Sequence, residues 1–318
     1  MLNIAILGYG TVGSGVYEIA TQNADNIAEK CKTRINVKKI LDTRDFPGDP
    51  AEKLFVKDFD SILNDAGISI VVECIGGLNP AYEYTKALLE KGKSVVTSNK
   101  AVVAEHGQEL VDIAAKNNAQ YLFEASVGSV IPIIRPLATS IIAGPITEIM
   151  GILNGTTNYI LTRMLRNNES FNDALKMAQK EGYAEYDPTE DIEGYDAARK
   201  IAILAWLAFG KLGKDAYWKN MPITGVTKIT QEDLRKADAE GCVLKLIGQA
   251  KLVNGKVECK VEPMQIPKTS PLANVDDVFN AIVVRGEYAG ELMFYGRGAG
   301  KLPAADAMMA DVMNICLQ

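Results

Sequence analysis

Residues 2–20 read LNIAILGYGTVGSGVYEIA, and this stretch decides the fold of the first part of the chain. The short apolar run Leu2–Leu7 leads into glycines spaced Gly-x-Gly-x-x-Gly, at Gly8, Gly10 and Gly13, and a helical pattern follows. In a strand, turn and helix of this kind, the glycines allow a tight turn, close approach of a pyrophosphate and close helix packing. The helix N-terminus adds amide dipoles that attract an anion. The stretch predicts dinucleotide binding; a glycine turn that serves packing alone is the alternative.

The bulk composition favours a two-domain protein that binds small molecules. The chain has 318 residues, 47% of them apolar, and its net charge is −6 with a sequence pI of about 5.1. It has no basic run, so a nucleic-acid or anionic-membrane partner is not indicated. The five cysteines lie far apart without a Cys-x-x-Cys pair, which is typical of reduced thiols.

Two further features narrow the location and the chemistry. The start MLNIAILGYG lacks a basic signal-peptide region, and the longest apolar run, Ile201–Phe209, is half a membrane span, so we expect a cytoplasmic protein. His106 is the only histidine, which excludes a histidine-based zinc site and leaves Lys, Tyr, Asp or Glu as a general acid. We expect His106 itself to be structural, near a helix start.

Strand and helix signals alternate through the first 125 residues. The expected strands after the first are Val37–Leu41, Ser69–Cys74, Ser94–Thr97 and Gln120–Glu124, with helices at Ala81–Lys91 and Glu105–Asn117. This alternation predicts an α/β fold, a Rossmann-type doubly wound parallel sheet. Three polar or glycine-rich loops follow strand ends, where such sheets bind ligands: Gly76-Gly77, Ser98-Asn99-Lys100 and Ser126–Ser129.

From residue 126 the pattern changes, and we expect a second, α+β domain over 126–295 for catalysis and dimerisation. Its expected elements are a strand at Thr147–Leu153, a helix from about Thr156, a helix from the N-cap Ser170 to Gly182, a hairpin of Val243–Val253 and Val257–Pro263 around Asn254-Gly255, and strands at Ile282–Glu287 and Leu292–Tyr295. A second glycine-rich segment at 296–300 leads into a last helix; it can bring backbone amides to the cofactor, and a flexible connector to that helix is the alternative. We expect residues 296–318 to return to the NAD(P)-binding domain, 1–125.

The acidic stretch GYAEYDPTEDIEGYDAARK, 182–200, runs directly into an apolar helix. A helix that begins near Gly194 places Asp196 and Lys200 one turn apart on one face. A surface ion pair is the alternative interpretation. Lys100 also stands out because it follows a strand on the ligand edge, although an ordinary loop cation remains the alternative. A desolvated lysine has the lowered pKa that suits a proton donor to a carbonyl.

The carboxylates near Lys200 indicate what a substrate carries. Glu185, Asp191 and Asp196 can accept hydrogen bonds from an ammonium or a hydroxyl group, and Thr156 and Thr157 with nearby amides can hold a carboxylate. An amino-acid aldehyde fits such a set. The other acids of the stretch we assign to a turn or to solvent: Asp187, Glu190 and Glu193.

Seven collinear motifs resemble the homoserine dehydrogenase family. They are GYGTVG (8–13), VVECIGG (71–77), VVTSNKA (95–101), FEASVG (123–128), GILNGTTNYIL (151–161), GYAEYDPTEDIEGYDAARKIAILA (182–205) and YGRGAG (295–300). The resemblance implies NAD(P)-dependent interconversion of L-homoserine and L-aspartate 4-semialdehyde, in threonine, methionine and isoleucine biosynthesis. It also implies a homodimer.

The resemblance implies residue roles as well. It makes Lys200 the proton donor, with Lys100 assisting near the nicotinamide, and Glu185, Asp191 and Asp196 substrate ligands. The implied cofactor residues are Gly8, Gly10, Thr11, Val12, Gly13, Asp42, Arg44, Gly76, Thr97, Ser98, Lys100, Gly182, Gly298 and Gly300. A structural monovalent cation, usually sodium, is expected at Glu124 and the main-chain carbonyls of Val127, Ser129 and Ile131.

The chain departs from the family pattern in three places. Gly128-Ser129-Val130 is bulkier than usual, which weakens the expectation of a cation site, and Pro303-Ala304-Ala305 replaces Pro-Thr-Ala. The chain ends at residue 318, where many members continue into an ACT domain, so a short form is expected. Another amino-acid dehydrogenase, or a non-catalytic dinucleotide-binding regulator, is the alternative function; intact lysines at positions 100 and 200 argue against the regulator.

The choice between NAD and NADP rests on a conflicting pair of residues. Asp42 directly follows the end of the second strand, where an acid would accept from the ribose 2′-hydroxyl of NAD, but it comes 29 residues after Gly13 rather than the usual roughly 20. Arg44 can instead clamp the 2′-phosphate of NADP, with Lys57 as a second cation. We expect both cofactors to bind, with a modest preference for NADP.

Overall fold

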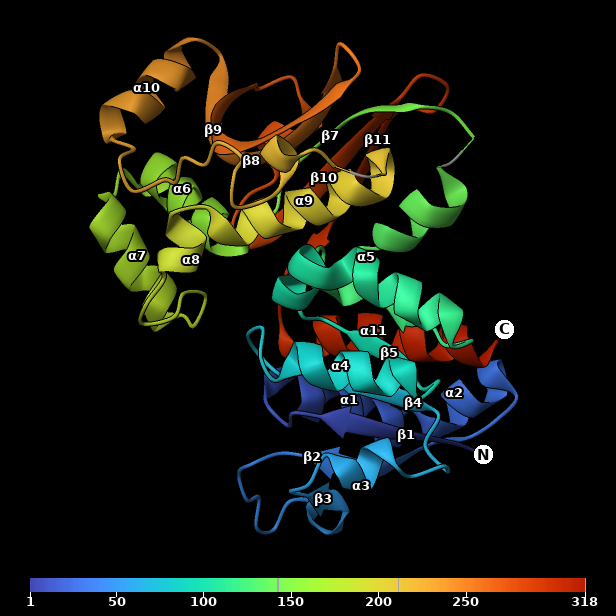
Figure 1. Ribbon diagram of the computed structural model, residues 1–318. Coiled ribbons are helices and arrows are strands. Elements are labelled where there is room, and N and C mark those ends of the chain that lie inside the picture. The colour runs from blue at the N-terminus through green and yellow to red at the C-terminus, as the bar shows by residue number, and fades with distance from the viewer. Residues whose placement is uncertain (142, 211, 318) are drawn as a thin grey trace. The chain divides into compact units, whose positions relative to one another are not determined.

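The computed structural model describes residues 1–141, 143–210 and 212–317, and the chain divides into two compact units (Figure 1). The first unit comprises residues 1–130 and the segment from residue 299 onward, and the second comprises 131–298. These bounds differ by a few residues from the domain limits expected at 125 and 296.

The first unit holds a parallel sheet, six-stranded in the part of the chain described, in the order β3-β2-β1-β4-β5-β6. The strands are β1 (Leu2–Leu7), β2 (Ile35–Leu41), β3 (Phe55–Val56), β4 (Ile70–Glu73), β5 (Ser94–Thr97) and β6 (Tyr121–Leu122). Strand order reverses between β1 and β4, the point where open sheets bind ligands. Ile4 and Ile6 are fully buried, as expected for strands covered on both faces. The predicted Rossmann-type sheet is confirmed.

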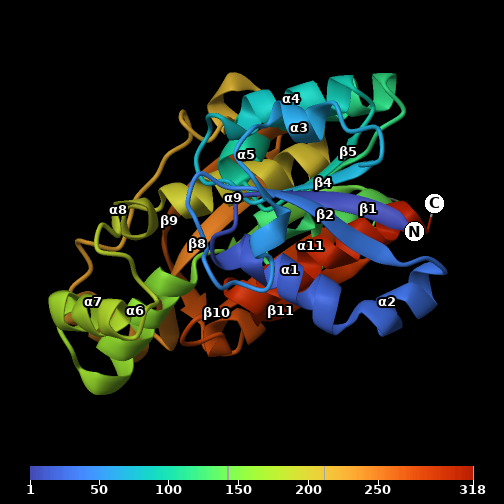
Figure 2. The same cartoon turned by 90° about the horizontal axis from the view of Figure 1, so that it is seen from below.

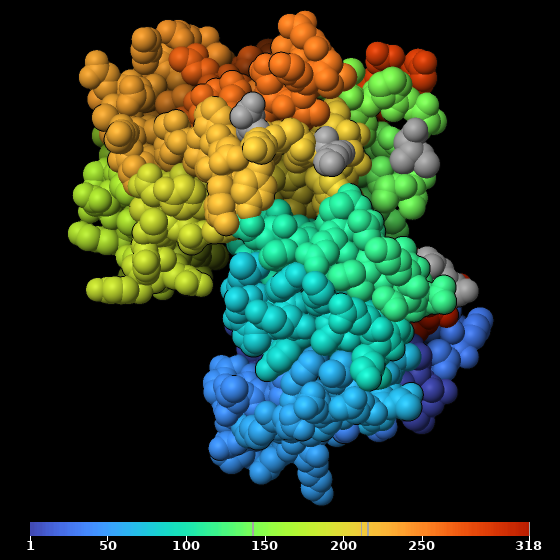
Figure 3. All heavy atoms as spheres, viewed as in Figure 1, coloured from blue at the N-terminus to red at the C-terminus, as the bar shows by residue number. Residues whose placement is uncertain are grey.

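Helices cover both faces of this sheet (Figure 2). On one face lie α3 (Asp60–Leu63), α4 (Ala81–Glu90) and α5 (Lys100–Lys116), and on the other lie α1 (Thr11–Gln22), α2 (Ala24–Cys31) and α11 (Lys301–Cys316). In the view of Figure 3, α4 and α5 (cyan to green) form much of the visible surface of the first unit. Helix α11 packs so closely on α1 that a Cβ on Gly15 would lie 3.0 Å from that of Ala305. Short 3-10 turns lie at η1 (Glu52–Leu54) and η2 (Glu124–Ser126).

The second unit is built on an antiparallel sheet in the order β11-β10-β7-β8-β9. Its strands are β7 (Ile146–Ile152), β8 (Cys242–Val253), β9 (Lys256–Pro267), β10 (Phe279–Gly286) and β11 (Gly290–Arg297). Asn254 and Gly255, which join β8 to β9, have φ of 51° and 76°, as a two-residue hairpin turn requires.

Helices and short turns surround that sheet. They are η3, a π-helical turn (Pro136–Ser140), α6 (Gly155–Asn167), α7 (Phe171–Lys180), α8 (Thr189–Ile192), α9 (Tyr195–Phe209), η4 (Lys214–Ala216), α10 (Gln231–Ala239) and η5 (Pro271–Asn274). Helix α9 begins after Gly194, whose φ is 86°. It lies tightly on the sheet, because a Cβ on Gly248 would meet Leu153 at 2.8 Å and Ile201 at 3.2 Å.

Local predictions were wrong at three places in the first unit. Helix α5 begins at Lys100 rather than at 105, because the Asn99 side chain caps it by accepting from the amides of Ala101 and Val102. His106 therefore lies inside the helix, stacked on Tyr82 with ring centroids 3.8 Å apart. The strand expected at 120–124 is only β6, since Glu124 already belongs to a 3-10 turn.

Candidate active site

The glycine turn after β1 leaves room for a ligand at one of its glycines. Gly8 has φ +88°, and a Cβ there would lie 3.0 Å from the Cys74 carbonyl oxygen. A Cβ on Gly13 would lie 1.9 Å from the Gly8 carbonyl oxygen, so only glycine lets α1 pack on the turn. A Cβ on Gly10 would meet only Nη2 of Arg44, at 3.9 Å. The turn therefore fits a pyrophosphate that approaches over Gly10 at the N-terminus of α1.

Asp42 and Arg44 form a bidentate ion pair beside this turn. Asp42 is buried; its carboxylate accepts from the Tyr9 amide at 2.7 Å and from Nε and Nη2 of Arg44 at 3.0 and 2.9 Å. The Arg44 side chain holds the pKa of Asp42 down at about 2. The Arg44 side chain is 60% exposed and stacks over Phe46 at 5.1 Å. The exposed group of this pair is thus the cation.

The other predicted cofactor residues of the first unit lie in helix starts and loops at the carboxyl edge of the sheet. Thr11 and Val12 open α1, Gly76 follows β4, Thr97 ends β5, Ser98 follows it, Lys100 opens α5, and Gly300 precedes α11. Thr97 is completely buried, and Lys100 is half-buried. Gly76 has no atom within 4 Å of an added Cβ, so its position is open.

In the second unit, polar side chains meet at the N-termini of α6 and α9. Asn154 caps α6 and donates from Nδ2 to Asp191 Oδ1 at 2.7 Å and to Asp196 Oδ2 at 2.9 Å. Lys200 Nζ lies 2.8 Å from Asp196 Oδ2 and donates to the Leu153 carbonyl at 2.8 Å. Asp196 is 1% exposed and Lys200 8%, so this is not a surface ion pair.

Asp191 joins this cluster through α6. Its Oδ2 lies 2.9 Å from the hydroxyl of Thr156, which also lies 2.7 Å from the Tyr183 carbonyl oxygen. Burial raises the pKa of Asp191, and the neighbouring Asp196 adds to this; the hydrogen bonds from Thr156 and Asn154 oppose it. Two carboxylates, one lysine and a helix N-terminus therefore surround a single polar centre. Such a centre suits a small molecule that carries charges of both signs.

The remaining predicted residues of this region lie differently. Glu185 is exposed, and its main-chain carbonyl accepts from Gln179 at 3.1 Å. Thr157 is 1% exposed, and its hydroxyl bonds Oδ1 of Asn154 at 2.9 Å within the cap of α6. Gly182 has φ +78° and no atom within 4 Å of an added Cβ. The structure thus groups Asp191, Asp196, Thr156 and Lys200. Thr157 joins them only through Asn154, and no hydrogen bond described here links the side chain of Glu185 or Gly182 to the group.

Gly298 is tightly packed, and the residues expected to bind the cation are buried. A Cβ on Gly298 would overlap the side chain of Asn280 at 2.0 Å. The expected cation ligands Glu124, Val127, Ser129 and Ile131 are all buried. Ser129 has φ 54°, and its buried hydroxyl has no hydrogen-bond partner. Among the residues described, no three His, Cys, Asp or Glu side chains are placed to bind a metal ion, and no helix is long and apolar enough to cross a membrane.

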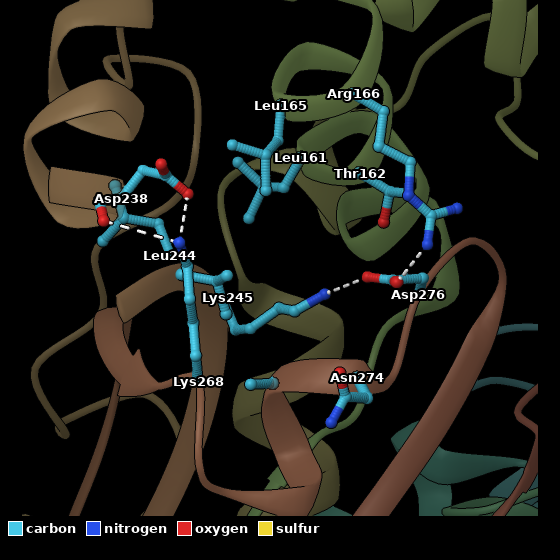
Figure 4. A pocket seen from close by; sticks show the side chains of 12 residues that line it. Leu161, Thr162, Leu165, Arg166, Asp238, Leu244, Lys245, Lys268, Asn274 and Asp276 are labelled. Carbon is cyan, nitrogen blue, oxygen red and sulfur yellow. Dashed lines mark hydrogen bonds and ion pairs between the residues drawn. The ribbon is translucent and has the colours of Figure 1, made fainter. Parts of the chain in front are cut away.

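A separate cavity of about 260 Å³ opens in the second unit between α6, α10 and β8 (Figure 4). Its charged groups pair with one another: Lys245 lies 2.9 Å from Asp276, which also pairs with Arg166, and Lys268 lies 2.7 Å from Asp238. Burial lowers the pKa of Lys245. None of the predicted substrate residues lines this cavity.

Two residues central to the geometry were missed in the sequence. Asn154 stands between the strand expected at Thr147–Leu153 and the helix expected from about Thr156 and received no site role, although Asn before a helix start is a common N-cap. Glu73 lies within the VVECIGG motif but received no role, because nothing in the sequence shows that it is fully buried. Its place at a strand end, next to the loop before Gly76, is the one signal available.

Comparisons with known proteins cover nearly the whole chain. Residues 132–313 match the family model described as homoserine dehydrogenase, and residues 8–124 match its NAD-binding domain model. The chain is 39% identical over 319 residues to homoserine dehydrogenase of Bacillus subtilis, covering 99% of this chain and 72% of that protein. A crystal structure of a homoserine dehydrogenase from Thiobacillus denitrificans superposes with a TM-score of 0.93 at 38% identity, over 99% of this chain and 73% of that one. A hyperthermophilic archaeal homoserine dehydrogenase in complex with NADPH gives 0.80 at 28% identity, over 98% and 97%.

Proposed function

Since the chain belongs to the homoserine dehydrogenase family, we propose that Lys200 moves the proton in its NAD(P)-dependent interconversion of L-homoserine and L-aspartate 4-semialdehyde. The observation that carries this proposal is the buried ammonium of Lys200, held at 2.8 Å by Asp196 in the polar centre of the second unit. When bound, NAD(P) supplies or accepts the hydride. The test is a steady-state assay of homoserine oxidation in Lys200→Ala, in which turnover is lost and cofactor binding is kept.

Lys200 suits both directions of the reaction. In reduction its ammonium gives a proton to the aldehyde oxygen as that oxygen becomes a hydroxyl, and in oxidation the neutral amine takes the proton back. Asp196 and the Leu153 carbonyl hold Nζ in one place, so little reorganisation is needed at the moment of transfer. Lys100, the first residue of α5, is proposed as the assisting lysine.

The amino-acid end of the substrate requires groups of both charges. We assign its ammonium to Asp191 and Asp196, which are bridged by Asn154, and we assign Glu185 to the exposed side of the same site. The first amides of α6 suit the substrate carboxylate because a helix N-terminus attracts anions. Of the two threonines, Thr156 reaches Asp191, whereas the hydroxyl of Thr157 is engaged by the helix cap.

We propose a preference for NADP over NAD. The Asp42 carboxylate already accepts from the Tyr9 amide and from Arg44, so few of its lone pairs remain for a ribose hydroxyl. The exposed Arg44 guanidinium is well placed for a 2′-phosphate. Lys57 Nζ donates to the main-chain carbonyls of Thr43 and Arg44, and these bonds hold the backbone that carries the Arg44 side chain.

We also propose a homodimer formed through the sheet of the second unit. Tyr295 on the edge strand β11 is 54% exposed and stacks on Phe279, with ring centroids 5.1 Å apart. Both lie on the sheet face opposite to Gly151 and Gly248, which face α9, because neighbouring residues in a strand alternate sides. Light scattering should give twice the chain mass for the native protein, and Tyr295→Glu should shift it toward the monomer.

The monovalent cation and the cytoplasmic location remain predictions. The unpartnered hydroxyl and positive φ of Ser129 support a ligand at this bend, and a sodium-dependent rise in melting temperature that lithium does not reproduce would test it. The described cysteines are all free thiols, which supports a reducing compartment. Fractionation of the native organism would test the location.

A further inference from the structure

Glu73, at the carboxyl end of β4, is a fully buried carboxylate with two strong donors. Its Oε1 accepts from the Ile75 amide at 2.6 Å, and its Oε2 accepts from the Thr97 hydroxyl at 2.6 Å. No basic side chain pairs with it in the described part of the chain. Burial raises its pKa to about 7, against the effect of these hydrogen bonds. An apolar residue, like Val71 and Val72 before it, would be buried here at lower cost.

The Thr97 hydroxyl links Glu73 to Asn99 by hydrogen bonds. It accepts from the Asn99 amide at 2.9 Å, and the Asn99 side chain donates to the carbonyls of Ile75 at 2.9 Å and Gly77 at 2.7 Å. Glu73, Thr97, Asn99 and Ile75 thus form a closed ring of hydrogen bonds. This ring fixes the loop after β4 to the segment after β5.

The ring reaches two further parts of the ligand edge. Oδ1 of Asn99 caps α5 through the amides of Ala101 and Val102, so it sets where Lys100 begins that helix. The loop after β4 also lies against the glycine turn, because a Cβ on Gly8 would meet the Cys74 carbonyl oxygen at 3.0 Å. Three cofactor-facing segments therefore depend on one buried carboxylate.

We propose that Glu73 is a positioning residue for the nicotinamide cofactor: through Thr97 and Asn99 it fixes the loop after β4 and the start of α5 in their binding geometry. This proposal rests on the proposed function in one respect: Lys100, at the start of α5, is taken to lie near the nicotinamide. Glu73 itself is buried and does not touch the cofactor.

The test uses Glu73→Gln and, as a matched control, Tyr121→Phe. Gln keeps the shape of Glu but has one acceptor oxygen for two donors, so one link of the ring is lost. Tyr121 is also buried in the same sheet, and its hydroxyl has no hydrogen-bond partner, so its removal breaks no link. The measurements are the Kd of NADPH by fluorescence titration without homoserine, and the melting temperature at pH 8.

Glu73→Gln should weaken NADPH binding about fivefold, the scale of one lost hydrogen bond, while the melting temperature stays level or rises because a buried charge is gone. Tyr121→Phe should leave the Kd unchanged. A Kd within twofold of the native value in Glu73→Gln would overturn the proposal. If Glu73→Gln does not fold, Thr97→Val and Thr97→Ser make the same comparison, since only serine keeps the hydroxyl. Lys200→Ala should keep its NADPH affinity, so a wrong proton donor and a wrong positioning residue give different results.

Discussion

Lys200 Nζ lies 2.8 Å from Oδ2 of Asp196, one turn earlier on α9, and both side chains are buried where the helix meets its sheet. An isolated surface pair at this spacing contributes a few tenths of a kcal/mol to helix stability. Burial of two opposite charges is costly by comparison, and it is repaid only with close geometry and further hydrogen bonds. The Leu153 carbonyl and the side-chain amide of Asn154 provide those bonds. The buried pair therefore indicates a role in function and not in stability alone.

Lys200→Ala should lower kcat for homoserine oxidation by about 100-fold or more, because a positioned general acid contributes on this scale. NADPH affinity should change little. The measurement is steady-state kinetics followed by cofactor absorbance, with Arg199→Gln as the control, since the neighbouring Arg199 pairs with Glu190 and stacks on Trp218. Near-native turnover in Lys200→Ala would contradict the assignment.

Asp196→Asn should raise KM for homoserine by about tenfold, the scale of a lost charge-assisted hydrogen bond. A fall in kcat should accompany it, because Lys200 loses the carboxylate that orients it. Asp191→Asn should mainly raise KM, because Asp191 is held by Asn154 and Thr156. Glu190→Gln is the control within the same acidic stretch, and unchanged constants in both aspartate variants would make these carboxylates structural.

The sequence predicted the fold well where the physical signals are local. Gly8 in the first turn and Asn254-Gly255 in the hairpin have positive φ, which few other residue types adopt, so both turns were predictable from the local sequence. The start of α5 was missed by five residues since its cap, Asn99, also resembles an ordinary loop residue. Its capping role appears only once its side chain is seen to accept from Ala101 and Val102.

The site was predictable as a set of residues but not as a network. Motifs at 151–161 and 182–205 indicated the acids and Lys200. The hydrogen bonds from Asn154, however, reach Asp191 and Asp196, which lie 37 and 42 residues further along the chain. Such a contact depends on how α6 and α9 pack, which periodicity does not encode. Glu73 was missed for a different reason, because a charged residue is rarely fully buried.

Glu73 should make stability depend on pH. Its pKa is about 7 when folded, against an ordinary value of 4.5, so between these values the native state holds a proton that the unfolded chain has released. The free energy of unfolding therefore falls as pH rises from about 4.5 to about 7, by up to roughly 3 kcal/mol, and is flat above. Urea unfolding at pH 5.5 and pH 8 should show Glu73→Gln gaining on the native protein at the higher pH. A pH-independent difference between the two would show that Glu73 does not titrate in this window.

Arg44→Ala should lower the ratio of kcat/KM for NADP to that for NAD by about tenfold or more. Two effects act in the same direction. The exposed guanidinium that suits the 2′-phosphate is removed, and a charge-assisted bidentate contact is worth at least a factor of ten. Asp42 is also released from Nε and Nη2 of Arg44, so its carboxylate becomes free to accept from the ribose hydroxyl of NAD and to repel the phosphate. Lys57→Ala is the matched control: its ammonium is engaged by main-chain carbonyls and by Asp45, so the ratio should change much less. If Arg44→Ala leaves the ratio as it was, Arg44 does not bind the phosphate and Asp42 is the residue that selects the cofactor.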